Sequence, residues 1–261
     1  MKGLLFAGDS YTWGQGLYYY SDLPRIQTPP PGHYRPEYVT EAHKRFKDTK
    51  RFARLVANHF DTFELTKDIN GGSDDDSLAF IDKTFSFHYK YEDISYLILQ
   101  TTQAFRSEFN FIYKDEYYSF QVNSHTPLTD IQNNALNGWM DENNYTFNDL
   151  TKIHKKRVFN DIKAKFMFLE EKGVKCRIIC WLTDYIPLIT TDEYMKNRLI
   201  RIKLGNQTFL NFQNMVNTHN QFLISHDPYF SESNGDSHIS LEAHKIVADN
   251  IIKNIEKDLY E

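Results

Sequence analysis

Two stretches near opposite ends of the chain carry residues that could act together in nucleophilic catalysis. The first is Gly8-Asp9-Ser10, which directly follows a short apolar run at residues 3–7. If that run is a strand, Ser10 lies at its carboxyl end, at or near a helix N-terminus. Unpaired N–H groups and the helix dipole would there stabilise an alkoxide or a tetrahedral oxyanion. A serine in this position can equally be a helix N-cap, so the motif needs a partner.

The second stretch, Asn234-Gly-Asp236-Ser-His238, precedes the last helical pattern of the chain. A serine nucleophile requires a base, and the base requires a carboxylate that fixes its tautomer. His238 can be that base and Asp236 the orienting carboxylate, provided that this loop lies over the tip of the first strand. Asn234 is an alternative orienting group. His244, inside the helical pattern, is expected to pack rather than to react.

The elements that must position these residues alternate along the chain. Near-continuous apolar runs predict strands, and apolar residues at helical spacing predict the helices between them. This alternation predicts one α/β domain over residues 1–261, with a mainly parallel sheet between two helical layers. The predicted strands are 3–7, 62–69, 94–100, 175–182 and 221–226, and the predicted helices are 41–60, 75–88, 150–172 and 240–259.

Three longer stretches do not fit a minimal version of this fold. Residues 17–40 are rich in Pro and Tyr and predict a loop, residues 109–148 show aromatic patches and turns, and residues 184–220 include a predicted helix at 192–203. Long insertions in compact domains are usually functional, and ligands bind beyond the carboxyl ends of parallel strands. We therefore expect these insertions to wall a cleft.

In chain order, the two terminal motifs and the alternation between them resemble the SGNH (GDSL-type) hydrolase superfamily. The resemblance implies a three-layer, flavodoxin-like α/β/α fold with a mainly parallel five-stranded sheet. It also implies metal-free hydrolysis of esters, thioesters or acetylated sugars. On this pattern Ser10 is the nucleophile, His238 the general base and acid, and Asp236 its orienting partner.

The resemblance also assigns an oxyanion hole. Members of the family use the N–H of a glycine after the second strand, and here Asn70-Gly71-Gly72 follows the predicted strand, with Gly72 the first choice and Gly71 the second. A glycine pair can also serve only as a tight turn. The serine's own N–H completes the pair of backbone donors.

Two blocks depart from the family pattern. Gln100-Thr101-Thr102-Gln103 stands in place of Gly-x-Asn-Asp, so Thr102 takes the position of the amide donor, and Gln100 or Arg106 would have to reach in as substitutes. A hydroxyl donates one hydrogen bond but is shorter than an amide. The usual Asp-x-x-His is replaced by Asp-x-His, because Gly235 stands three residues before His238.

Composition excludes several other classes. A net charge of −5 argues against a nucleic-acid binder, and no apolar run reaches the roughly 18–20 residues of a membrane helix, so we expect a soluble, cytoplasmic protein. No dinucleotide loop, phosphate-binding loop or zinc motif is complete, and we expect neither a metal nor a cofactor. Cys176 and Cys180 lie about 13 Å apart on a strand, too far for a disulfide, so both are expected to be buried free thiols.

The sequence therefore predicts a serine esterase that hydrolyses a carboxylic ester through an acyl-enzyme intermediate. The substrate would be a small-molecule or carbohydrate ester, with an O-acetylated sugar favoured by the aromatic insertions. Two alternatives stay open: an acyltransferase, or a binding or structural protein that keeps the fold with impaired catalysis. The sequence does not indicate an oligomeric state.

Overall fold

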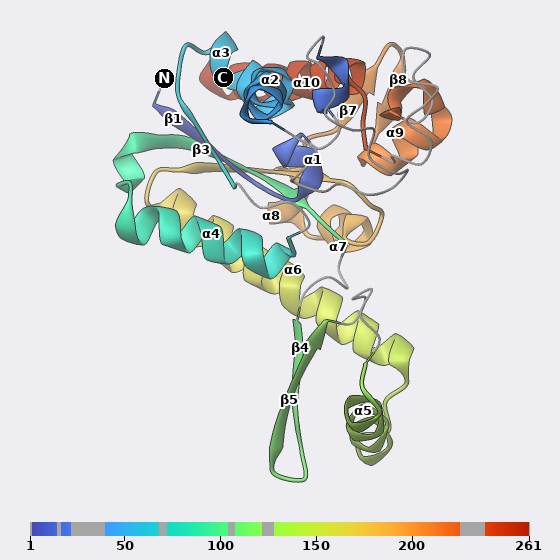
Figure 1. Cartoon of the computed structure of the whole chain (residues 1–261). Helices are drawn as coiled ribbons and strands as arrows, with labels where there is room; N and C mark the ends of the chain where they lie inside the picture. Colours follow the sequence, from blue (N-terminus) through green and yellow to red (C-terminus); the bar gives the residue numbers. More distant parts are fainter. Residues whose placement is uncertain are drawn as a thin grey trace.

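A four-stranded parallel sheet forms the centre of the molecule in the computed structural model (Figure 1). Its strands are β1 (Gly3–Ala7), β2 (Glu64–Thr66), β3 (Ile94–Thr101) and β6 (Lys175–Cys180), in the order β2-β1-β3-β6. These four strands follow the order of a flavodoxin-like sheet. The structure describes residues 2–14, 17–21, 40–67, 72–103, 108–121, 128–224 and 238–260.

Helices cover both faces of this sheet, as the near-continuous apolar strands predicted. Leu4 and Phe6 of β1 pack in one core with α3 (Phe52–His59) and α10 (Leu241–Tyr260). Leu5 and Ala7 point to the other core, which α4 (Asp74–Phe87) and α6 (Phe147–Glu171) complete. The predicted three-layer arrangement is therefore confirmed (Figure 1).

Local signals explain where these helices begin and end. The predicted helix 41–60 is two helices, α2 (Glu41–Lys50) and α3, because Arg51 is extended and its guanidinium pairs with Glu64 at 2.6 Å. Ser73 and Asp76 form a capping box at the start of α4. Gly173 ends α6 with φ +86°, which is typical of a C′ glycine. Ser240 caps α10 through Ala243 N–H.

The predicted fifth strand, 221–226, is wrong as far as the structure describes it. Residues Asn220–Phe222 form a 3₁₀ turn, and Leu223 makes a single antiparallel bridge to Ile239. The open edge of β6 is covered by irregular backbone instead: Ile178 N–H donates to Arg198 and Ile200 N–H donates back to Ile178. Since this segment forms hydrogen bonds with the edge backbone of β6, no further regular strand is required there.

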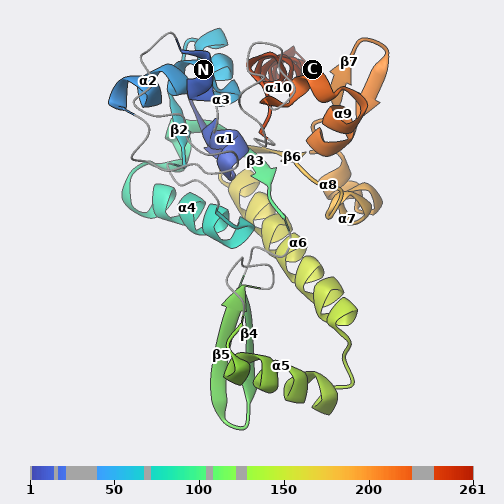
Figure 2. The same ribbon diagram turned by 45° about the vertical axis from the view of Figure 1, so that its right-hand side comes forward.

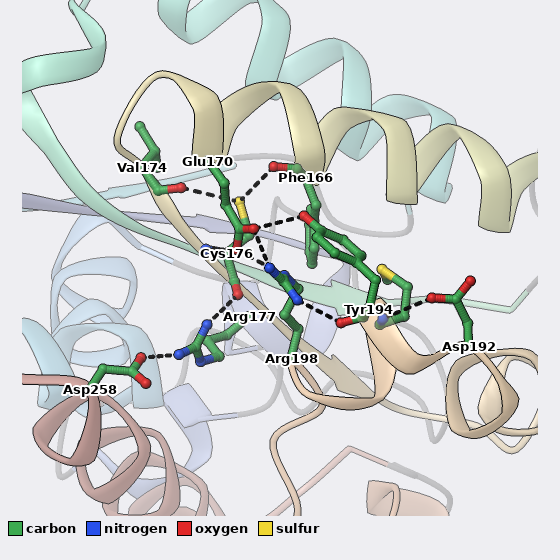
Figure 3. A network of polar contacts seen from close by, with 10 residues as sticks. Phe166, Glu170, Val174, Cys176, Arg177, Asp192, Tyr194, Arg198 and Asp258 are labelled. Atoms are coloured by element: carbon green, nitrogen blue, oxygen red, sulfur yellow. Dashed lines mark hydrogen bonds and ion pairs between the residues drawn. The ribbon is translucent and has the colours of Figure 1, made fainter. Parts of the chain in front are cut away.

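A polar network fixes that irregular segment to α6 and β6 (Figure 3). Arg198 forms an ion pair with Glu170 and donates to the backbone carbonyl of Tyr194 at 2.6 Å, and the Tyr194 hydroxyl donates to Glu170 at 2.8 Å. Cys176, beside this network, and Cys180 are free and buried, which confirms the prediction for both thiols. Burial raises the pKa of Cys180 to about 12, so its thiol stays protonated.

The insertion at 184–220 does not contain the predicted helix 192–203. It comprises short elements, because Asp192 caps only one turn before the chain turns back toward β6. These elements are α7 (Ile186–Thr191), α8 (Glu193–Lys196), β7 (Ile202–Leu204), β8 (Gln207–Phe209) and α9 (Phe212–Thr218).

The insertion at 109–148 folds as an appendage that projects away from the sheet (Figures 1 and 2). It consists of the antiparallel hairpin β4 (Glu108–Tyr113) and β5 (Glu116–Gln121), followed by α5 (Asp130–Glu142). Its own small core includes Phe109, Phe111, Leu136 and Leu150, the last from the first turn of α6. Sequence patterning had indicated only patches and turns here.

Candidate active site

Ser10 lies where the sequence placed it, at the carboxyl end of β1. This strand runs between β2 and β3, and Ser10 is the first residue of the short helix α1 (Ser10–Trp13). The turn before it is tightly filled: a Cβ on Gly8 would lie 2.3 Å from Thr12 Oγ1 and 2.8 Å from Gln100 Oε1. Glycine is thus required for the close approach of β1 to the end of β3.

Buried side chains hold the backbone on both sides of Ser10. Gln100 Oε1 accepts hydrogen bonds from Thr12 Oγ1 at 2.9 Å and from Asp9 N–H at 3.4 Å. Asp9 Oδ1 accepts from Tyr11 N–H at 3.1 Å. Gln100 was considered as a substitute oxyanion donor, but its side chain is fully buried and its amide donates to the Thr101 carbonyl at 2.8 Å. This arrangement makes Gln100 a support of the turn.

The imidazole of His238 lies beside the first turn of α1. Its ring centroid is 4.9 Å from that of Tyr11, at an angle of 40°. Tyr11 is the residue after Ser10, and its other neighbour is Trp181, with the ring centroids 3.6 Å apart. Two stretches separated by more than two hundred residues in sequence therefore meet at this edge of the sheet.

The segment that carries His238 is fixed by backbone hydrogen bonds. Ile224 N–H donates to the His238 carbonyl at 2.9 Å, and Ser240 N–H donates to the Phe222 carbonyl at 2.7 Å. His244, one turn into α10, accepts from Phe52 N–H at 3.2 Å and stacks on the Phe52 ring. Burial lowers the pKa of His244 to about 3, with His238 and Arg51 contributing, so its ring stays neutral. His244 has the packing role that was predicted.

The candidate oxyanion glycine, Gly72, is buried directly before the N-cap of α4. Among the described residues, no acceptor takes its N–H. A Cβ on Gly72 would lie 2.1 Å from Lys67 Nζ. Lys67 follows β2 directly and was not singled out from the sequence. The sequence around it gives no distinct signal, because Glu64 and Asp68 are charged as well in the same predicted strand.

Thr102, which takes the position of the family's amide donor, is fully buried. Its N–H donates to Asp74 Oδ1 at 2.9 Å, and its hydroxyl donates to the Gln103 carbonyl at 3.3 Å. Both of its donors are therefore engaged with the protein's own acceptors. The predicted residues Asp236, Gly71 and Arg106 and the alternative Asn234 lie outside the described residues, as does the side chain of Ser10.

Asp74 connects three elements behind this edge. One carboxylate oxygen accepts from Thr102 at the end of β3, and the other accepts from the Tyr185 hydroxyl at 2.9 Å. Burial raises the pKa of Asp74 to about 7, although its two hydrogen bonds favour the charged form.

The described part of the chain offers neither a metal site nor a membrane-crossing helix. No group of three or more His, Cys, Asp or Glu side chains there is arranged to hold a metal ion. None of its helices combines the length and the apolar character that a membrane-crossing helix requires.

Comparisons with known proteins give little sequence similarity. No family model matches the chain, and no curated protein matches it. A solved structure from Parabacteroides merdae, described as a "putative GDSL-like lipase", aligns over 97% of this chain and 94% of its own. The sequence identity is 11% and the TM-score is 0.39. Because these values are low, the function has to be argued from the geometry of this chain.

Proposed function

We propose that the chain is a serine esterase of the SGNH type, which hydrolyses a carboxylic ester through an acyl-enzyme intermediate. The observation that carries the proposal is the contact between the imidazole of His238 and the ring of Tyr11, next to Ser10. Nucleophilic catalysis by serine requires a general base near the hydroxyl, and an imidazole is the usual one. The flavodoxin-like strand order supports the proposal, since ligands of such sheets bind beyond the carboxyl ends of the strands.

The reaction divides into two displacements. In the first, Ser10 Oγ attacks the ester carbonyl while His238 takes its proton, and the carbonyl electrons move onto oxygen. The tetrahedral intermediate collapses, His238 protonates the leaving alcohol, and the acyl group stays on Ser10. In the second, His238 takes a proton from water, the resulting hydroxide attacks the acyl carbon, and the acid leaves as Ser10 regains its proton.

The remaining predicted residues take supporting roles in this proposal. Asp236 orients the imidazole of His238, and the N–H groups of Ser10 and Gly72 bind the oxyanion. Gly71 and Arg106 are assigned to substrate binding. Gln100 is assigned to positioning, because its amide already holds the Gly8–Thr12 turn.

The proposed substrate class rests on the aromatic insertions and not on the rings next to Ser10. Tyr11 and Trp181 are buried and stacked on each other, so they present no free face to a ligand. We propose an O-acetylated carbohydrate as the preferred ester, because the insertions are rich in aromatic residues, whose faces suit the CH faces of a sugar ring. Comparing acetate release from acetylated xylan and from p-nitrophenyl acetate tests this choice, and faster turnover of the simple ester at matched concentrations would argue against it.

One observation favours a second function. The Thr102 hydroxyl, at the position of the missing amide, donates to a neighbouring carbonyl. A site without a third oxyanion donor would turn over about 100- to 1,000-fold more slowly. Such a protein would bind ester or carbohydrate ligands without efficient hydrolysis. An acyltransferase would use the same residues, with an alcohol in place of water.

The serine itself provides the test. The wild-type protein should react with a fluorophosphonate probe and hydrolyse short p-nitrophenyl esters, and Ser10→Ala should abolish both activities. Ser119→Ala, which alters an exposed serine of the appendage, is the matched control and should retain both. Equal signals from the wild type and Ser10→Ala, or none from either, would favour the binding function.

A further inference from the structure

Lys67 presents a buried ammonium group at the carboxyl edge of the sheet. It directly follows β2, whose last residue, Thr66, pairs with Phe6 of β1. Its side chain is nearly inaccessible, with only 3% of the residue exposed. A lysine in such a position loses most of its hydration, which is costly unless another group replaces it.

No such replacement is present within the described part of the chain. Lys67 Nζ is buried and has no hydrogen-bond partner there, whereas the other buried cations Lys47 and Arg51 both pair with carboxylates. Burial lowers the pKa of Lys67, while the carboxylates of Asp76, Asp9 and Asp74 act in the opposite direction. These carboxylates favour the charge of the amine, but none of them accepts a hydrogen bond from it.

The position of the amine relative to Gly72 indicates what it could bind. A Cβ on Gly72 would lie only 2.1 Å from Lys67 Nζ, so the amine packs closely against the proposed oxyanion glycine. The N–H of Gly72 also lacks a described acceptor. Two donors without a described acceptor thus belong to neighbouring residues in the fold, and one oxygen could accept from both. Meanwhile the donors of Thr102 are engaged elsewhere.

We propose that the ammonium group of Lys67 donates a hydrogen bond to the oxyanion of the tetrahedral intermediate, in place of the amide that this chain lacks. This inference rests on the proposed esterase function and deepens it. Lys67 keeps its proton throughout the reaction. Its charge matches the negative charge that appears on the carbonyl oxygen when Ser10 attacks and disappears when the intermediate collapses. A charged donor forms a stronger hydrogen bond than a neutral one, so a single lysine can replace the amide.

Lys67→Met tests this assignment, because methionine has a similar length and no charge. Lys83→Met is the matched control: Lys83 lines the same cavity of about 410 Å³ as Lys67, but it is exposed. We expect Lys67→Met to lower kcat about 100- to 1,000-fold with KM changed less than about threefold. Its affinity for a boronic acid, which forms a tetrahedral adduct with serine, should fall in the same proportion. Lys83→Met should match the wild type in all three measurements.

Several outcomes would overturn the assignment. One is an unchanged kcat in Lys67→Met; another is a loss of kcat without a loss of boronate affinity. A loss of activity that merely follows a loss of folded protein, measured by thermal unfolding and active-site titration, would indicate a structural role. If Lys67→Met does not fold, Lys67→Leu, which also lacks a donor, replaces it, with the same expected direction. A wild-type protein that no fluorophosphonate labels overturns the esterase proposal itself, and the role of Lys67 with it.

Discussion

At the scale of single residues, the contact between Gly72 and Lys67 allows a test that removes no ionisable group from the protein. Gly72→Ala adds one methyl group, which would lie 2.1 Å from Lys67 Nζ and displace the amine. The backbone of Gly72 is outside the left-handed region, so alanine adds no conformational strain. We expect kcat to fall at least about tenfold, by partial loss of one oxyanion donor, with little change in unfolding temperature.

The control for Gly72→Ala is Gly138→Ala in the appendage. Its new methyl group would meet the end of another flexible side chain, the Tyr113 hydroxyl, at 2.2 Å. This variant should keep full esterase activity. Equal kcat values for Gly72→Ala and the wild type would show that the position of the amine is irrelevant to the reaction.

Asp74 should make the stability of the protein depend on pH. Burial raises its pKa from the ordinary 3.8 to about 7. Between these values the folded protein retains a proton that the unfolded chain releases, so the free energy of unfolding falls as pH rises from about 4 to 7. Asp74→Asn removes the titration, while its amide can still pair with Thr102 N–H and the Tyr185 hydroxyl.

Urea unfolding at several pH values measures this effect. We expect the variant to lose less stability than the wild type between pH 4 and 7, and to be at least as stable above pH 7. Parallel pH profiles for the two proteins would contradict the raised pKa of Asp74.

The sequence allowed part of the site to be predicted, and the part that it did not reveal depends on tertiary packing. Gly8-Asp9-Ser10 and His238 were recognisable, because their chemistry is local and their positions follow from the strand and helix next to them. Lys67 was not recognised, since burial of a lysine depends on what packs over it. The engagement of Thr102 with Asp74 also could not be predicted, because it joins two elements distant in sequence.

At the scale of elements, the turn between β1 and α1 decides whether Ser10 is presented correctly. Gly8→Ala would place a methyl group against Thr12 Oγ1 and Gln100 Oε1. These two atoms are hydrogen-bonded to each other, so they cannot both move away without losing that bond. We expect the free energy of unfolding to fall by about 1–3 kcal/mol, as for overpacked cores, and activity to fall at least about tenfold.

A double variant distinguishes crowding from other causes. Adding Thr12→Ala removes the closest contact, so Gly8→Ala should cost less stability in the Thr12→Ala background than in the wild type. Strictly additive losses in urea unfolding would show that the turn is not crowded in the manner described.

The elements that sequence patterns predicted best are those with long, regular apolar spacing. Strands β1, β3 and β6 and helices α4, α6 and α10 lie where they were expected, within a few residues. The break at Arg51 was missed, because its extended backbone is stabilised by Glu64, a tertiary partner. The fifth strand was wrong, because irregular backbone around Arg198 and Ile200 pairs with β6 instead.

At the scale of the whole molecule, the appendage has a core separate from the two cores of the sheet. Trp139 packs against Phe109 and Phe111, whereas α6 passes from this small core into the one beneath the sheet. We expect Trp139→Ala to speed hydrogen exchange in β4, β5 and α5, while β1 and β3 keep their protection. Esterase activity on p-nitrophenyl acetate should be retained.

Equal acceleration of exchange in the sheet would contradict this separation. It would show that the appendage and the sheet open as one cooperative unit.

The overall arrangement was predictable because alternating strands and helices allow few topologies. The parallel sheet and the two helical layers follow from that alternation, whereas the strand order is what the family resemblance implied. The appendage was not predicted, since the core of a hairpin and a helix shows no single period along the sequence. That residues 1–261 form one domain, and that the insertions wall a cleft, stay predictions.

The central claim is that His238 activates Ser10, and the site and rate of covalent labelling test it most directly. A fluorophosphonate adduct should map by mass spectrometry to Ser10. His238→Ala should slow its formation at least about 100-fold, because general-base assistance is lost. His88→Ala, which changes an exposed histidine at the end of α4, should leave the rate unchanged. An adduct on another residue, or the same labelling rate in His238→Ala and the wild type, would contradict the account.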